Sequence, residues 1–120
     1  MSQMNIVNVS TIYGNTTGMA VTTTPTAIVT NASDSGAVYK INTLVVSNIS
    51  GTGSASITVD VYKNQTSAYR MSYQVPVTAN TSFSPIDKGL IIYLQENDSI
   101  RLTSSSNGSL EAVCSYEAIS

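Results

Sequence analysis

The chain has 120 residues, of which 42% are hydrophobic and only 10% are charged, and its formal net charge is −2. This length allows one domain with a two-layer core, and the hydrophobic content is higher than that of a disordered chain. The five basic residues are scattered singly along the sequence, so it lacks the basic stripe that a nucleic-acid partner requires.

The residue types that usually carry catalysis are missing. There is no histidine, and Cys114 is the only cysteine. These absences exclude Ser-His-Asp and Cys-His catalysis, the common zinc sites and an intrachain disulfide. We therefore expect a protein that is not an enzyme, with no catalytic residue, no metal site and no cofactor.

The N-terminal sequence MSQMNIVNVS lacks the basic and long apolar regions of a signal peptide, and no apolar run in the chain approaches the length of a membrane span. We expect a protein that is made in the cytoplasm and has no membrane partner. The apolar residues of this segment alternate imperfectly with polar ones, which predicts an edge strand or an arm that pairs with a partner. The candidate partner-binding residues are Met4, Ile6, Val7 and Val9.

A turn cluster, YGNTTG at 13–18, follows the N-terminal segment. We therefore predict an extended arm or edge strand over 1–18 and a β-sandwich domain over 19–120.

Short strands come next. Two are expected at 19–22 and 26–30, separated at Pro25, because proline cannot donate to a central ladder. The longer run at 39–49 changes its apolar phase, and either a bulge near Thr43 or burial on both faces would explain the change.

Apolar and polar residues alternate at 57–63 and 68–75, as in half-buried strands, and a polar loop follows up to Gly89. In the last strand, 110–119, Cys114 falls on the apolar face, where a free thiol behaves as a small buried hydrophobe. No window shows the period of an amphipathic helix. The sequence therefore predicts an all-β fold: a single-domain antiparallel β-sandwich, jelly-roll-like, with roughly eight or nine strands.

The segment LIIYL at 90–94 is apolar on both faces, with Leu90, Ile92 and Leu94 on one side and Ile91 and Tyr93 on the other. A strand of this kind is either central and covered on both faces, or has an outer face that meets a neighbouring subunit. We therefore take Ile91 and Tyr93 as candidate self-association residues.

Two carboxylates, Glu96 and Asp98, lie in the turn QEND that precedes the strand expected at 99–103. They could share a cation, but calcium sites usually gather more anionic ligands in a patterned loop. A solvated turn, in which Asn97 and Asp98 serve turn chemistry, is favoured.

Five of the seven tyrosines lie inside expected strands: Tyr39, Tyr69, Tyr73, Tyr93 and Tyr116. An exposed row of tyrosines could stack on sugar rings, which gives a carbohydrate-binding, lectin-like module as an alternative function. Packing in the core and at subunit contacts is favoured, because a phenol can bury its ring while its hydroxyl group stays hydrated.

Five segments follow one another in a recognisable order: VVSNISG, SITVDVYK, YQVPVTANTSF, GLIIYLQENDSIRLTSS and LEAVCSYEAI. This order, over about residues 39–119, resembles that of the small all-β virion proteins of tailed bacteriophages. An "IPA"-like turn of that family corresponds to residues 75–77, and a "GDxIxV"-like turn corresponds to residues 97–102. Asn97 stands where the family usually has glycine.

The resemblance implies a virion structural protein that binds without chemistry. We expect a capsid decoration or cement protein that binds the major capsid protein on the capsid surface and stabilises the head. The alternative within the virion is a tail, neck or fibre component. The resemblance also implies a homo-oligomer, with a trimer favoured, and docking through an extended N-terminal segment that adds a strand to a partner's sheet edge.

Overall fold

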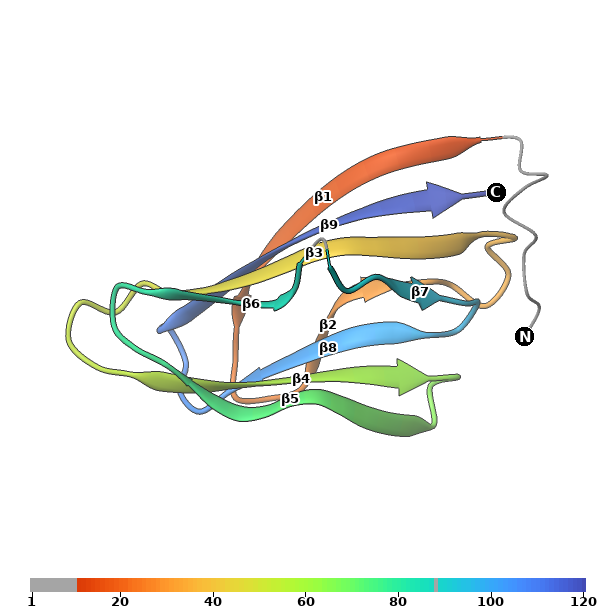
Figure 1. Ribbon diagram of the computed structural model, residues 1–120. Helices are drawn as coiled ribbons and strands as arrows, with labels where there is room; N and C mark the ends of the chain where they lie inside the picture. Colours follow the sequence, from red (N-terminus) through yellow and green to blue (C-terminus); the bar gives the residue numbers. More distant parts are fainter. Residues whose placement is uncertain (1–10, 88) are drawn as a thin grey trace.

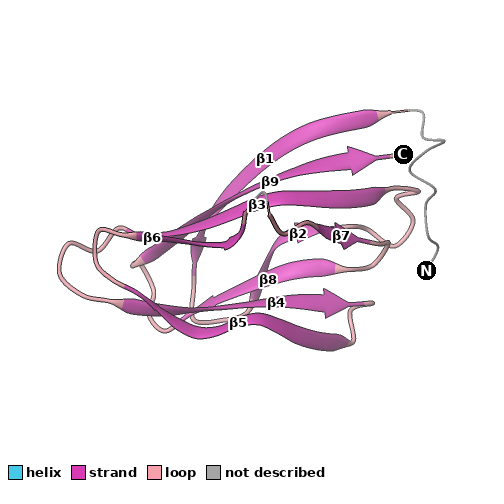
Figure 2. Cartoon of the chain, viewed as in Figure 1, coloured by secondary structure: helices cyan, strands magenta, loops and turns pink. Residues whose placement is uncertain are grey.

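The computed structural model describes residues 11–87 and 89–120, and this part of the chain is all-β (Figure 2). Within it, no helix has the length and hydropathy that are needed to cross a membrane. The described residues form nine strands: β1 (Ile12–Val21), β2 (Thr26–Thr30), β3 (Val38–Asn48), β4 (Ala55–Lys63), β5 (Ser67–Val77), β6 (Ser82–Ile86), β7 (Ile92–Leu94), β8 (Ser99–Ser104) and β9 (Leu110–Ile119).

The strands form two antiparallel sheets (Figure 1). One sheet has the order β1-β9-β3-β6, with β7 also paired to β3, and the other has the order β2-β8-β4-β5. When β6 and β7 are counted as one strand position, this is the strand order of a jelly roll, in which two four-stranded sheets are joined by Greek-key connections. The predicted jelly-roll-like β-sandwich is therefore confirmed.

The core lies between the sheets and is built from the inward-facing residues of both. In β4, Ile57 and Val59 are fully buried whereas Thr58 between them is half-buried, as their alternation predicts. Cys114 of β9 is also fully buried in this core, on the apolar face where the sequence predicts it. The largest fully buried side chains are Ile41, Leu44, Ile57, Ile86, Leu94, Ile100, Leu102 and Leu110.

The first strand differs from the prediction for its residues. The cluster at 13–18 is not a turn, because it belongs to a ten-residue strand that pairs with β9 along its whole length. The continuous ladder to β9 outweighs the weak strand propensity of Gly14 and Gly18. The strand predicted at 19–22 is the end of β1, whereas the strand at 26–30 is confirmed as β2.

The segment 90–94 is a shorter strand than predicted and lies at the edge of its sheet. It begins only at Ile92, because the chain is still turning at Leu90, whose N–H donates to the carbonyl oxygen of Asp87 at 2.9 Å. Its strand, β7, pairs with β3 alone. The alternative of a central strand covered on both faces is therefore wrong: Ile91 is 44% exposed and Tyr93 is 45% exposed.

A further strand, β6, occupies part of the segment that the sequence predicts as a polar loop. It pairs with β3, where Phe83 lies opposite Val46. Its Pro85 and its polar residues hide it from a search for alternating patterns, but proline is tolerated on an edge strand because no ladder bond is lost there.

Two local features predicted from the sequence, a bulge in β3 and the turn QEND, are confirmed. The register of β3 against β9 shifts between Ile41 and Thr43, which is the expected bulge. In the turn QEND, the N–H of Asp98 donates to the carbonyl oxygen of Gln95 at 3.1 Å, and Asn97 has a φ of 72°. Asparagine adopts this left-handed backbone more readily than most residues, so it is suited to this position of the turn.

Candidate interaction surfaces

A buried carboxylate anchors the turn between β7 and β8. The side chain of Asp98 is fully buried, and its Oδ2 lies 2.6 Å from Nζ of Lys63. The same oxygen accepts a hydrogen bond from the N–H of Gln95 at 3.1 Å, and Oδ1 accepts one from the N–H of Asn64 at 2.9 Å. Because Lys63 ends β4 and Asn64 begins the connection to β5, Asp98 ties two turns together.

The loop between β2 and β3 joins the same cluster through a buried amide. Nδ2 of Asn31 donates to the carbonyl oxygens of Ala37 at 2.8 Å and Leu94 at 3.0 Å. The N–H of Asn31 donates to the carbonyl oxygen of Asp98 at 2.9 Å. Three connections at one end of the sandwich are therefore held by polar groups whose hydrogen bonds are satisfied.

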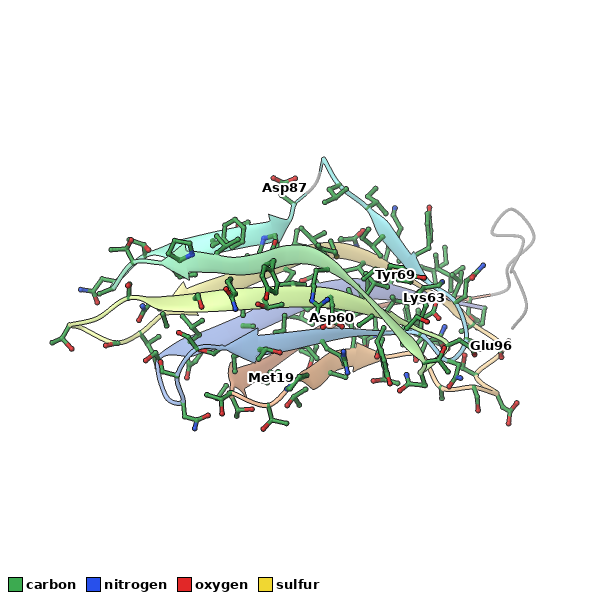
Figure 3. The ribbon with its side chains drawn as sticks, turned by 90° about the horizontal axis from the view of Figure 1, so that it is seen from below. Met19, Asp60, Lys63, Tyr69, Asp87 and Glu96 are labelled. Atoms are coloured by element: carbon green, nitrogen blue, oxygen red, sulfur yellow. The ribbon has the colours of Figure 1, made fainter. Side chains whose placement is uncertain are left out.

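The two carboxylates of the turn QEND point to different partners. Asp98 is directed at Lys63, whereas Oε2 of Glu96 accepts a hydrogen bond from the N–H of Gly36 at 3.0 Å. Figure 3 shows Lys63 and Glu96 at the same end of the sandwich. Among residues 11–87 and 89–120, no group of three or more acidic, histidine or cysteine side chains is placed to hold a metal ion. The favoured turn interpretation needs one correction, because Asp98 is buried and not solvated.

A second charged cluster lies across β4 and β8. Arg101 is opposite Asp60, with Nε 2.9 Å from Oδ1 and Nη2 3.4 Å from Oδ2. The guanidinium carbon of Arg101 lies 3.9 Å from the centre of the Tyr62 ring. These contacts leave Asp60 only 4% exposed. The sequence carries no signal of this cluster, because strand register, not sequence spacing, brings the residues together.

The tyrosines divide into a packed pair and exposed single rings. Tyr39 and Tyr116 stack with their ring centres 5.2 Å apart, and burial raises the pKa of Tyr116. Tyr69 and Tyr73 of β5 are each more than 60% exposed. Packing therefore accounts for Tyr39 and Tyr116, whereas Tyr69 and Tyr73 are exposed. The guanidinium carbon of Arg70 lies 5.5 Å from the centre of the Tyr73 ring.

The candidate self-association residues form part of an exposed apolar patch at the β6–β7 edge of one sheet. Leu90, Ile91 and Tyr93 are each about 45% exposed. Tyr93 lies opposite Lys40 of β3. The structure thus keeps Ile91 and Tyr93 on the surface, as the alternative of contact with a neighbouring subunit requires.

The predicted partner-binding residues Met4, Ile6, Val7 and Val9 lie outside the described residues. Their point of attachment is described. Thr11 and Ser120 exchange two backbone hydrogen bonds of 2.8 and 2.9 Å, and their hydroxyl groups lie 2.8 Å apart. The chain is therefore fixed to the end of β9 from Thr11 onward.

The two sheets have four edges in the described chain, and three of them carry features that discourage pairing with another chain. On one sheet, β2 is five residues long with a register shift, and β5 contains Arg70, Pro76 and two register shifts. On the other, β6 contains Pro85 and β7 has three residues. The fourth edge, β1, has ten residues, no charge, no proline and no register shift.

Comparison with known proteins identifies a similar fold. No protein-family model matches the sequence, and no curated protein matches it. A solved structure from the endospore appendages of Bacillus, a family of disulfide-linked pili, is similar with a TM-score of 0.55 and 15% sequence identity. The match covers 100% of this chain and 96% of that chain. At this identity the likeness shows a shared fold.

Proposed function

We propose that the protein is a non-enzymatic structural subunit of a bacteriophage virion, which decorates the capsid surface, binds the major capsid protein and stabilises the head. The geometry of the chain ends carries this proposal. Thr11 is bound to Ser120 just before the start of β1, so the predicted docking segment, residues 1–10, is attached to the domain at the edge of a sheet. An extended segment in this position is suited to adding a strand to a partner.

The physical advantage of such a subunit comes from repetition. On a symmetric shell each copy makes the same contacts with its neighbours, so many modest affinities add to a large stabilisation. The similar fold in a pilus, which is also a repeated assembly, supports the general role of a structural subunit.

Assembly of this chain differs chemically from that of disulfide-linked pili. Its only cysteine, Cys114, is fully buried, and burial raises the pKa of its thiol to about 11. Because the thiolate is the reactive form, this thiol is protected from disulfide exchange near neutral pH. Contacts between copies, and contacts with the capsid, are therefore non-covalent in this proposal.

The proposed subunit also self-associates, as a trimer, through the exposed residues Ile91 and Tyr93. Burying these side chains would remove apolar surface from water at about 25 cal/mol per Å². Replacing Ile91 and Tyr93 together by serine is expected to abolish trimers in sedimentation experiments without unfolding the domain. Trimers that persist would exclude this patch as the contact.

The docking step is tested by deleting residues 1–10 and measuring binding of the purified domain to capsids that lack it. Loss of binding with an unchanged circular dichroism spectrum is expected. Two full-length variants refine the test. Replacing Met4, Ile6, Val7 and Val9 by serine should abolish binding, whereas replacing Asn5 and Asn8 by serine should preserve it. Binding that survives the deletion would contradict docking through this segment.

The alternatives are separated by location and ligand. Imaging intact particles and counting copies relative to the major capsid protein distinguishes capsid decoration from a tail, neck or fibre position, and from an appendage subunit.

A carbohydrate-binding module is favoured by the exposure of Tyr69 and Tyr73. Glycan-array binding that disappears in the Tyr69→Ala and Tyr73→Ala variants would establish that alternative.

A further inference from the structure

Among the described residues β1 pairs only with β9, and its outer edge has a definite hydrogen-bond pattern. Thr11 and Ser120 donate to each other's carbonyl oxygens, so they form a hydrogen-bonded pair of the antiparallel ladder. Such pairs alternate with non-hydrogen-bonded pairs, and the register of β1 against β9 has no shift. Every second residue of β1 from Tyr13 onward therefore directs its N–H and C=O groups to β9. The residues between them direct theirs away from the sheet.

The outward-directed set is Ile12, Gly14, Thr16, Gly18 and Ala20, and all five residues are exposed. Four of them have small side chains, so their backbone groups are accessible to another strand. Figure 1 shows β1 as the outermost strand of its sheet. The set is also symmetric in spacing about Thr16. A second β1 strand, running antiparallel, would present the same five residues in the reverse order.

We propose that two copies of this chain pair through their β1 edges about a twofold axis at Thr16, which merges two sheets into one continuous antiparallel sheet. In this pairing Thr16 lies opposite Thr16 of the second copy, and Gly14 lies opposite Gly18 of the second copy. Each outward N–H then meets an outward C=O of the other strand. The threonines form a cross-strand pair of a type that stabilises sheets.

A second copy fits this edge over nearly its full length, because pairing about Thr16 places residues 12–20 opposite the same residues of an equally long strand without a register shift. β1 also carries no charge that would repel its own copy. The contact is isologous, so it closes after two copies. The opposite edge of the same sheet, formed by β6 and β7, has the proline and short strands that prevent further growth.

This contact goes beyond the proposed function and does not depend on it, because it needs only the purified protein. The β1 edge and the patch of Ile91 and Tyr93 lie on opposite edges of one sheet. The two contacts therefore use different surfaces, and the β1 contact is measured in a background in which Ile91→Ser and Tyr93→Ser remove the other one. In this background the unmodified β1 edge, called wild type below, should give dimers and a blocked β1 edge should give monomers, a twofold ratio of mass.

The experiment uses opposite charges at Thr16, followed by sedimentation at micromolar concentration. Thr16→Lys and Thr16→Glu each place like charges at the axis and should each halve the mass, with a dissociation constant raised about tenfold or more. An equal mixture of the two variants should restore the wild-type mass, because lysine then faces glutamate. Ser115→Lys is the control: its hydroxyl group lies 3.1 Å from that of Thr16, but β9 is not at the edge.

Thr16→Pro provides a second way to block the edge, because it removes only an outward N–H. It should also halve the mass, with a circular dichroism spectrum like that of the wild type. A wild-type protein with the same mass as Thr16→Pro would overturn the proposal. So would a lysine and glutamate mixture that stays at the mass of its components, or a Ser115→Lys variant whose mass is halved.

Discussion

At the scale of a single side chain, the carboxylate of Asp98 ties the turn between β7 and β8 to the turn between β4 and β5. It is fully buried, yet it meets the ammonium group of Lys63 and the N–H groups of Asn64 and Gln95. A buried charge is tolerated when its partners satisfy it, and removing one partner leaves the others without compensation. The turn therefore depends on this carboxylate more than on any other acidic residue in QEND.

Replacing Asp98 by alanine is expected to lower the free energy of unfolding by about 3 kcal/mol, because two N–H groups and Lys63 lose their acceptor. Asp34→Ala is the matched control, since Asp34 is an exposed acidic residue in the β2–β3 loop, and its effect should stay within about 0.5 kcal/mol. Urea denaturation monitored by circular dichroism measures the unfolding free energies of the two variants. Equal effects of the two substitutions would contradict the anchoring role.

The buried thiol of Cys114 makes the stability of the fold depend on pH in the alkaline range. Burial raises the pKa of its thiol from 9.0 to about 11. The unfolded chain therefore loses the proton at a lower pH than the folded chain. The stabilisation is fully present below pH 9.0 and is lost as the pH rises to about 11, because the unfolded state binds fewer protons there. The loss amounts to about 2 kcal/mol.

The Cys114→Ala variant tests this dependence. It is expected to be less stable than the wild type at pH 8, because it leaves a small cavity, but the gap should narrow as the pH approaches the folded-state pKa of about 11. Burial also raises the pKa of Tyr116, so titration of this residue lowers the stability of both proteins at alkaline pH. Urea denaturation at pH 8 and at the alkaline limit gives the comparison, and parallel declines would show that the thiol is not responsible.

At the scale of elements, β1 shows that pairing decides structure where local propensity is weak. Its two glycines and its Asn-Thr-Thr centre are typical of turns, but β9 offers ten partners in an unbroken register. Only the last part of β1 contributes to the core, through Met19 and Val21. The strand therefore depends on its ladder to β9 more than on burial.

Proline substitutions distinguish the two sides of this strand. Thr16→Pro removes an outward N–H and should lower the unfolding free energy of the domain by no more than about 1 kcal/mol. Asn15→Pro removes an N–H that bonds to β9 and should cost about 3 kcal/mol or more. The comparison is made by thermal and urea denaturation at concentrations low enough to avoid association. Equal losses of unfolding free energy in the two variants would show that the N–H groups of Asn15 and Thr16 do not point to opposite sides of the strand.

The elements that could be predicted are those with their own local pattern. Alternation predicts β4, β5 and β9, the phase change predicts the bulge before Thr43, and the inward position of Cys114 follows from its strand. β6 was hidden because Pro85 and its serines have no alternating pattern. The Asp98 cluster and the Asp60–Arg101 pair could not be predicted, because their members are distant in sequence and meet only through turns and strand register.

At the scale of the whole molecule, the surface is polar but almost uncharged. Charged residues are 10% of the chain, and residues 1–10 contain no charged side chain. The proposed self-association and docking would therefore rest on backbone hydrogen bonds and apolar contacts, which salt screens very little. Electrostatic attraction would contribute little to them.

The dissociation constant of the proposed capsid association is therefore expected to change by less than about threefold between low salt and about 0.5 M NaCl. Binding isotherms on purified capsids measure this directly, with a charged decoration protein of known salt dependence as the control. A loss of tenfold or more at the higher salt would show that ion pairs carry the docking contact.

The pairing of Thr11 with Ser120 brings the last residue of the chain next to the start of β1. A peptide fused after Ser120 would therefore emerge beside Thr11, at one end of the sandwich. The loop between β3 and β4 lies at the other end of the sandwich, where Gly51 and Gly53 have open space around them. A peptide inserted there would project from the opposite end, so one small domain offers two attachment points with different orientations for display on a particle.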